Sequence, residues 1–159
     1  MEIKTADLCD RFSDRLEIGE PIFGSYGGRE CFGGPVVTVK VFEDNSFVRQ
    51  ALEEPGEGRV LVVDGGGSER CALVGDQLAL LGQRNEWAGI VVYGCIRDSA
   101  EIATIDLGVK ALGCHPLKSV KRNEGQRDIP VAFAGMRIAP GNIVYADRDG
   151  IIVSEAALL

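Results

Sequence analysis

The chain has 159 residues, of which 45% are hydrophobic, a size and composition that suit one globular domain spanning residues 1–159. Its formal net charge of −7 argues against direct nucleic-acid binding, which needs a basic face, but allows a protein partner with a basic surface. The five cysteines form no C-x-x-C pair, which argues against a disulfide framework or a thiolate zinc site. No apolar run is long enough to span a membrane and residues 1–7 lack the apolar core of a signal peptide, so we expect a cytoplasmic protein.

The first third of the chain is predicted to form a helix, a loop, a strand and a short second helix. In chain order these elements span residues 5–15, 18–31, 36–42 and 45–52. Thr5 can cap the first helix, and either Asn45 or Ser46 can cap the second. Pro35 stands before the strand, where proline is tolerated.

The segment from residue 59 to residue 98 carries the strongest pattern. An apolar strand at 59–64 is followed by three glycines at 65–67, a helix that opens at Gly75-Asp76, and a second apolar strand at 89–94. Two strands joined by a helix form a βαβ unit, whose strands are parallel and whose crossover is right-handed. Ligands of such sheets bind beyond the carboxyl ends of the strands, so we expect a site at that edge.

The remainder of the chain is predicted to hold a further helix, several short strands and a last helical turn. The helix covers 99–107, the strands 111–114, 130–134, 143–146 and 151–153, and the final turn 154–159. Residues 119–127 are expected to form an exposed turn or hairpin, and residues 147–150 a tight turn. The predicted fold class is α/β, a single layered domain with a mainly parallel central βαβ unit plus β-hairpins.

Asp76, Arg97, Asp98 and Glu101 are the candidate functional residues. Twenty residues separate Asp76 from Arg97, and one helix plus one strand would return both to the same sheet edge. Asp98 could bind a divalent cation through oxygen, and Arg97 could bind a substrate carboxylate with its planar fork. The backbone amides of residues 75–78 would form an anion site at a helix N-terminus. From spacing alone the plainer alternative is favoured, in which Arg97-Asp98 caps the next helix and forms a surface ion pair.

Other candidate motifs are weaker. The glycines at 65–67 lack the G-x-G-x-x-G pattern and the Walker lysine, so a tight turn is the better interpretation. His115 is the single histidine and cannot build a histidine-rich zinc site. Lys40 is the one candidate for a Schiff-base lysine, and an edge-strand position explains it equally well.

Four runs of the sequence resemble the family of the regulator of ribonuclease E activity A and the class II 4-hydroxy-4-methyl-2-oxoglutarate aldolases. The runs span residues 32–40, 60–68, 85–94 and 145–155, and they are closest to the regulator branch. The aldolase branch also has an Asp, twenty residues, Arg-Asp, two residues and an acid. Asp76, Arg97, Asp98 and Glu101 fit that pattern throughout.

The resemblance implies a swivelling-domain-like layered fold and a ring-shaped homotrimer with sites near the subunit boundaries. It places a divalent cation (Mg²⁺ or Mn²⁺) at Asp98, and substrate at Arg97 and at Gly75, Asp76, Gln77 and Leu78. Phe23, Tyr26 and Phe32 stand in glycine-rich loops, and we expect them to line a subunit interface.

Two functions follow from these expectations. The first is a metal-dependent lyase that cleaves 4-hydroxy-4-methyl-2-oxoglutarate to pyruvate and also decarboxylates oxaloacetate. Arg97, Asp76 and Glu101 would serve its chemistry, with a water held by Asp76 or Glu101 as proton carrier. The alternative is an inhibitor that binds ribonuclease E through acidic turns at 53–57 and 147–149 and needs no metal.

Overall fold

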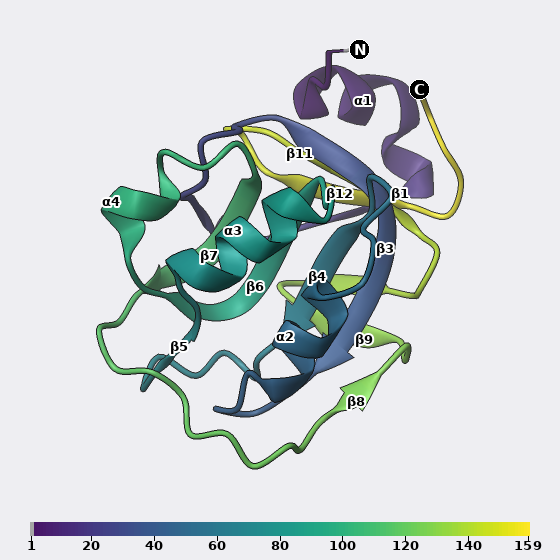
Figure 1. Cartoon of the computed structure of the whole chain (residues 1–159). Coiled ribbons are helices and arrows are strands. Elements are labelled where there is room, and N and C mark those ends of the chain that lie inside the picture. The colour runs from purple at the N-terminus through teal and green to yellow at the C-terminus, as the bar shows by residue number, and fades with distance from the viewer. Residues whose placement is uncertain (1) are drawn as a thin grey trace.

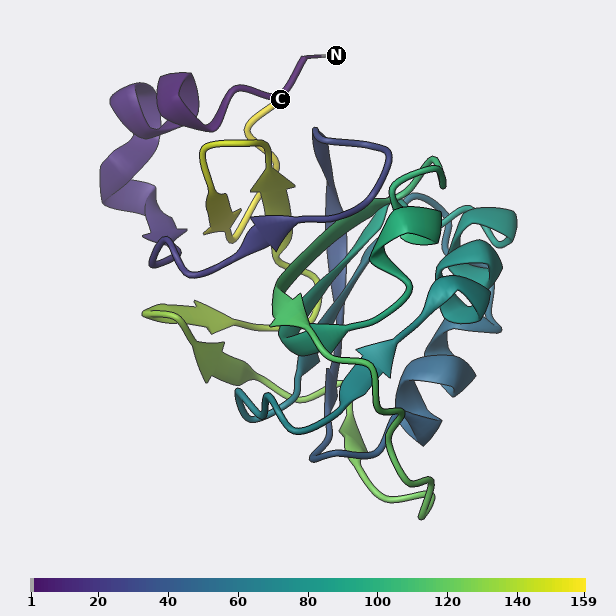
Figure 2. The same cartoon turned by 90° about the vertical axis from the view of Figure 1, so that its left-hand side faces the viewer.

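The computed structural model describes residues 2–159, which form a mixed sheet covered on both faces (Figures 1 and 2). The strand order is β1-β12-β11-β3-β4-β6-β7-β2, with β5 added beside β6 and β8 beside β3. The first strands are β1 (Leu16–Ile18), β2 (Gly24–Ser25), β3 (Phe32–Lys40), β4 (Val60–Asp64), β5 (Ala72–Val74) and β6 (Gly89–Ile96). The later strands are β7 (Gly108–Cys114), β8 (Gln126–Arg127), β9 (Val131–Phe133), β10 (Met136–Ile138), β11 (Ile143–Ala146) and β12 (Ile151–Ser154).

The centre of the sheet is parallel, as the sequence predicts. Strands β3, β4, β6 and β7 pair in parallel, and β5 pairs in parallel with the end of β6. The residues of β4 are all buried, which explains its continuous apolar sequence. Antiparallel strands β11, β12 and β1 extend one side, and β9 and β10 form a separate hairpin. The predicted α/β class with a parallel centre and hairpins is confirmed.

Strand β3 joins the antiparallel part of the sheet to the parallel part. Its first half pairs with β11 at residues 32–35, and its second half pairs with β4 at residues 36–40. Gly33, Gly34 and Pro35 therefore lie within the strand, although their sequence predicts a break before it. Proline is tolerated because Pro35 is exposed, and glycine is required at 34 because a Cβ there would lie 2.2 Å from the carbonyl oxygen of Gly58.

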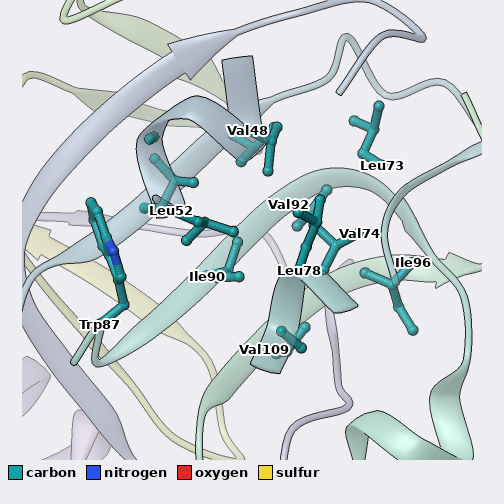
Figure 3. Packing of buried hydrophobic residues seen from close by; sticks show 14 of the residues in the cluster. Val48, Leu52, Leu73, Val74, Leu78, Trp87, Ile90, Val92, Ile96 and Val109 are labelled. Carbon is teal, nitrogen blue, oxygen red and sulfur yellow. The ribbon is translucent and has the colours of Figure 1, made fainter. Parts of the chain in front are cut away.

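Helices α2 (Ser46–Leu52), α3 (Asp76–Arg84) and α4 (Ser99–Ile102) cover one face of the sheet (Figure 2). Val48 and Leu52 of α2 and Leu78 of α3 point toward the strands, where Ile90 and Val92 of β6 meet them (Figure 3). The Trp87 ring closes the core and donates its Nε1–H to the carbonyl of Glu54 at 3.0 Å. This packing fixes the N-terminus of α3 relative to the end of β6.

The opposite face is covered by the β9–β10 hairpin, and side chains of β11 and β12, which continue the sheet, join the same core cluster. Helix α1 (Thr5–Phe12) lies beside the C-terminus (Figure 1). Phe32 is only 3% exposed and fills the space left by Gly89 and Gly108, where any Cβ would lie within 2.3 Å of its ring. Phe23 and Tyr26 also pack against the core clusters of their own chain. Phe32 is thus a core residue and not an interface residue, whereas Phe23 and Tyr26 are half-buried, and their expected place at a subunit interface stays a prediction.

Several predicted element boundaries are corrected by tertiary contacts. Helix α4 ends at Ile102 instead of 107, and turns and bends at 103–107 lead into β7, which pairs with β6 from Gly108 on. Residues 154–159 form no helical turn, and the amide of Leu158 donates to the Tyr145 hydroxyl instead. Thr5 is the first residue of α1 rather than its cap, because its hydroxyl donates to Asp147 at 2.6 Å.

Short strands were the elements that the sequence pattern missed. Strand β5 lies between the glycine loop and α3, and β10 follows β9; β1 ends where the segment expected to be a loop begins, and β2 lies inside that segment. Residues 120–125 form an exposed loop that leads into β8, which pairs with β3 instead of forming a hairpin of its own, while Ser119 is buried. No helix within residues 2–159 is long and apolar enough to cross a membrane.

Candidate functional site

The predicted site lies where β5 and β6 end side by side. The amide of Arg97, directly after β6, donates to the carbonyl of Val74 at the end of β5 at 2.9 Å. Gly75 and α3 follow β5, and Asp98 and α4 follow β6. The structure therefore brings Gly75, Asp76, Arg97 and Asp98 together at the carboxyl ends of parallel strands, as the twenty-residue spacing predicts.

Asp98 turns its carboxylate toward α3 and not toward its own helix. Its backbone is left-handed, with φ 57° and ψ 43°, a region that Asp tolerates better than most residues. The carboxylate Oδ2 accepts a hydrogen bond from the amide of Asp76 at 3.0 Å, and no side-chain cap bond is made to α4. The capping interpretation is therefore wrong about the carboxylate, although Asp98 does occupy the position before α4.

Arg97 is half-buried, and within residues 2–159 its guanidinium forms no ion pair with a carboxylate. The surface ion pair of the alternative interpretation is thus absent from the described chain. The Arg97 Nε would lie 3.4 Å from a Cβ placed at Gly75, so the Arg97 side chain runs beside the N-terminus of α3. Arg97 is therefore placed to offer its donors to a ligand at this edge.

The N-terminus of α3 supplies further donors. The Asp76 amide is used by Asp98, and the Ala79 amide donates to the carbonyl of Gly75 at 3.1 Å. Between them, the amides of Gln77 and Leu78 have no acceptor in the part of the chain that the structure describes. Free amides at a helix N-terminus and a neighbouring guanidinium form a small anion-binding surface.

Glu101 is less closely attached to the site. It is exposed in the first turn of α4, and across residues 2–159 no hydrogen bond or ion pair links its carboxylate to Asp76, Arg97 or Asp98. Its carboxylate is therefore free to meet solvent or a ligand.

The donor set fits a hard divalent cation held by one carboxylate. Asp98 Oδ1 has no hydrogen-bond donor within the described residues, while Oδ2 is fixed by the Asp76 amide. No group of three His, Cys, Asp or Glu side chains suited to a metal occurs within residues 2–159. Mg²⁺ commonly binds through one or two carboxylates and keeps most of its water ligands, so Asp98 alone is an adequate protein ligand.

The glycine loop lies one short strand away from this site. Gly65 and Gly67 both donate their amides to the carbonyl of Tyr93, at 3.1 Å and 3.2 Å. Gly66 and Gly67 have positive φ angles of 69° and 74°, which explains why glycine is needed there. The loop is a tight turn at the carboxyl end of β4, beside Tyr93 of β6.

A buried lysine was missed by the sequence pattern. Lys40 is exposed at the end of β3, whereas Lys110 in β7 is only 2% exposed and donates to the carbonyl of Asp147 at 2.6 Å. Burial lowers the pKa of Lys110 below its ordinary value. It lines a cavity of about 150 Å³, apart from the Arg97-Asp98 edge. The available signal was a lysine between apolar residues, in the run Val109-Lys110-Ala111-Leu112.

A larger hollow of about 730 Å³ lies between β1, β10 and the C-terminal segment, and it includes none of the predicted site residues. Its lining combines acidic and basic side chains, among them Asp14, Arg15, Glu17, Arg137 and Glu155. The predicted site is accordingly an open edge of the sheet rather than part of this hollow.

The two acidic turns differ in how freely they are exposed. Glu53 and Glu57 are exposed, whereas Glu54 forms an ion pair with Arg127. Asp147 is half-buried and accepts hydrogen bonds from the amide and hydroxyl of Thr5. Burial alone would raise the pKa of Asp147, but these bonds lower it overall. Asp147 is therefore a structural residue of its turn and not a free surface charge.

Comparison with known proteins gives one family. The family model described as "RraA-like: Aldolase/RraA" matches residues 5–153. A protein of Alkalilimnicola ehrlichii named "Putative 4-hydroxy-4-methyl-2-oxoglutarate aldolase" is 65% identical over 159 residues, which cover 100% of this chain and 99% of that protein.

Two solved structures have nearly the same fold. The RNA-processing inhibitor RraA from Thermus thermophilis has a TM-score of 0.96 and 43% identity, covering 100% of this chain and 96% of that chain. A structure from Geobacillus kaustophilus, titled as an S-adenosylmethionine:2-dimethylmenaquinone methyltransferase, has a TM-score of 0.94 and 52% identity, covering 98% and 97%. The chain therefore belongs to the RraA-like family, which unites aldolases and RraA proteins.

Proposed function

We propose that the protein is a carbon–carbon lyase that acts on small oxo acids, with 4-hydroxy-4-methyl-2-oxoglutarate as aldolase substrate and oxaloacetate as a decarboxylation substrate. The observation that carries the proposal is the convergence of Asp98, Arg97 and the α3 amides at the ends of β5 and β6. The relative from Alkalilimnicola ehrlichii supports the reaction class through its name.

The groups that would recognise the substrate are the hydrogen-bond donors of the site. The Arg97 guanidinium can bind a carboxylate through two parallel hydrogen bonds, and the free amides of Gln77 and Leu78 add donors beside it. Together these groups orient an oxo acid with its carboxylate toward α3.

Asp98 is the residue that would hold Mg²⁺ or Mn²⁺, through the carboxylate oxygen that the protein leaves without a donor. When bound, the cation supplies Lewis-acid stabilisation of the negative charge that develops on the oxo acid. The carboxylate needs no rearrangement for this role because the Asp76 amide already fixes its orientation.

Cleavage also requires proton transfer. The hydroxyl of the aldol substrate loses its proton as the neighbouring carbon–carbon bond breaks, and the pyruvate enolate that leaves takes up a proton. Glu101 is exposed and Asp76 is half-buried beside the site, so either carboxylate can orient the water that carries this proton. Decarboxylation of oxaloacetate produces the same enolate and can use the same groups.

The test is pyruvate release from both substrates with Mg²⁺, with Mn²⁺ and after complete chelation. We expect turnover with either metal and its loss on chelation. Equal rates under all three conditions would contradict the metal-dependent mechanism, and no release from either substrate would contradict the lyase itself.

A second function, inhibition of a ribonuclease by protein–protein binding, is supported by different observations. The neighbour from Thermus thermophilis is titled an RNA-processing inhibitor, and the net charge of −7 favours a basic partner surface. This activity would use exposed acidic residues such as Glu53 and Glu57 and would not need Asp98. One molecule could therefore carry both activities.

A further inference from the structure

Gly75 has no side chain, and the Asp98 carboxylate and the Arg97 side chain occupy the space that a Cβ would take. We propose that Gly75 is a positioning residue, which holds the Asp98 carboxylate against the N-terminus of α3 in the orientation that a divalent cation requires. The inference rests on the proposed function for its consequence, but the contact between Gly75 and Asp98 stands on geometry alone.

The space beside Gly75 is already filled by the site. A Cβ added there would lie 2.8 Å from Asp98 Oδ2, a separation that real Cβ atoms essentially never show, and 3.4 Å from Arg97 Nε. The backbone of Gly75 has φ −118° and ψ −170°, which any residue can adopt. A side chain at this position is therefore opposed by the Asp98 carboxylate in its present orientation and not by backbone conformation.

The Asp98 backbone cannot move away to make room. The preceding amide, that of Arg97, is bonded to the carbonyl of Val74 at 2.9 Å, and the Asp98 carbonyl accepts the amide of Ile102 at 2.9 Å. Both bonds hold the left-handed residue between β6 and α4. A side chain at Gly75 would therefore rotate the carboxylate, and Oδ2 would leave the Asp76 amide.

The hydrogen bond between the Asp76 amide and Asp98 also decides which backbone amides of α3 remain for a ligand. Because Asp98 occupies the Asp76 amide, a substrate carboxylate meets only the amides of Gln77 and Leu78 beside Arg97. Rotation of Asp98 would free the Asp76 amide as a competing donor. Substitution of Gly75 should therefore disturb both the cation ligand Asp98 and the amides that bind the oxo acid.

The experiment compares Gly75→Ala, directly before α3, with Gly82→Ala, a control substitution inside α3. A Cβ at Gly82 would meet Leu107 and Leu52 only at 3.5 Å, an ordinary contact, so the control should fold and bind normally. Binding of Mn²⁺ alone, followed by the electron paramagnetic resonance of the free ion, should weaken at least about tenfold in Gly75→Ala and stay unchanged in Gly82→Ala. Wild-type affinity in Gly75→Ala would overturn the proposal.

A second measurement is independent of metal and substrate. In the metal-free protein, hydrogen exchange at the Asp76 amide should accelerate in Gly75→Ala but not in Gly82→Ala, because only the former breaks the bond to Asp98. If wild-type protein neither binds Mn²⁺ nor releases pyruvate, the proposed function fails while exchange at Asp76 still decides whether Gly75 positions Asp98. Unchanged exchange at Asp76 in Gly75→Ala would overturn the positioning role.

Discussion

At the scale of single residues, the site depends on one carboxylate with two tasks. Asp98 accepts the first free amide of α3 and, in the proposed function, also holds the cation. Sequence spacing alone favours a cap for the following helix, because Asp is common before helices. The left-handed backbone of Asp98 cannot be recognised from the sequence. The left-handed turn directs the side chain to a different helix, which only the fold reveals.

The two tasks of Asp98 can be separated by substitution. Asp98→Asn keeps an oxygen that can accept the Asp76 amide but removes the negative charge, so metal-dependent turnover should be lost with little change in stability. Asp98→Ala also removes the acceptor of the Asp76 amide at the start of α3 and should cost about 1 kcal/mol in the free energy of unfolding. Pyruvate release and urea unfolding of both variants check this prediction. Full activity in Asp98→Asn would contradict a charged metal ligand at this position.

Arg97 should show a different kinetic signature. Arg97→Lys keeps the positive charge but replaces the planar fork with a single ammonium, so the loss should fall mainly on KM and less on kcat. Steady-state rates with oxaloacetate, over a range of concentrations, give both constants. A variant with unchanged KM and much reduced kcat would assign Arg97 to the chemical step instead.

At the scale of elements, Asp44 holds the start of α2 and the exposed 120–125 loop together. Its side chain is 1% exposed; Oδ1 accepts the amide and hydroxyl of Ser46, and Oδ2 accepts the amides of Arg122 and Glu124. The sequence indicates a cap at Asn45 or Ser46, and Asn45 takes that position without a side-chain cap bond. The partners at 122 and 124 are far away in the chain, which is why the pattern could not identify them.

This clamp predicts a loss of stability in acid. Burial alone would raise the pKa of Asp44, but hydrogen bonds from Ser46, Arg122 and Glu124 lower it overall from 3.8 to about 2. The pKa is lower in the folded state than in the unfolded state, so the stabilisation is fully present above about pH 4 and is lost as the pH falls through about 2. It amounts to about 2 kcal/mol at neutral pH.

The measurement is urea unfolding from neutral pH down to the acid range, with Asp44→Asn as the comparison. The variant should be less stable at neutral pH, because its side-chain NH₂ cannot accept the hydrogen bonds that one carboxylate oxygen receives. Its stability should also fall less steeply between about pH 4 and 2. Identical slopes for the two proteins would show that other carboxylates control the acid transition.

Elements with a long apolar pattern could be predicted from the sequence, and short ones could not. Strands β4 and β6 are buried on both faces and were evident from the sequence, as was the helix that opens at Asp76. Three-residue strands such as β5 and β10 were not, since their pairing partner and not their sequence defines them. The site could be assembled in advance because β6 and α3 were among the long elements; Lys110, inside β7, could not.

At the scale of the whole molecule, we propose a homotrimer, which the family resemblance implies. Phe32 is buried in the core, while Phe23 and Tyr26 are half-buried and keep some surface for an interface, and other large apolar side chains are also available. Those with substantial exposure are Ile18, Ile22, Phe42, Leu117, Val120 and Leu159. Isolated exposed apolar residues are ordinary on protein surfaces, so they permit an interface without specifying it.

Light scattering coupled to size-exclusion chromatography checks the assembly directly. The chain has a mass of 17.0 kDa, and the expected species has three times that mass. Replacing the two most exposed of these residues, Leu117→Lys and Val120→Lys, in one variant should weaken assembly if they contact a neighbour. A wild-type protein that remains monomeric at micromolar concentration would contradict the trimer.

The last prediction concerns the second proposed function, binding to ribonuclease E. A protein of net charge −7 should associate with a basic, RNA-binding segment through long-range attraction, which weakens as salt rises. The contact should involve Glu53 and Glu57, which are exposed, and not Asp147, whose carboxylate is occupied by Thr5. A pull-down of ribonuclease E at low and moderate salt should succeed equally with wild-type protein and with Asp98→Ala, because the metal ligand has no part in this surface.

The double charge reversal Glu53→Lys and Glu57→Lys should reduce binding several-fold, while reversal of the exposed Glu155 near the C-terminus serves as control. Absence of binding at low salt would exclude the inhibitor, and loss of binding in Asp98→Ala alone would place the ribonuclease contact at the lyase site.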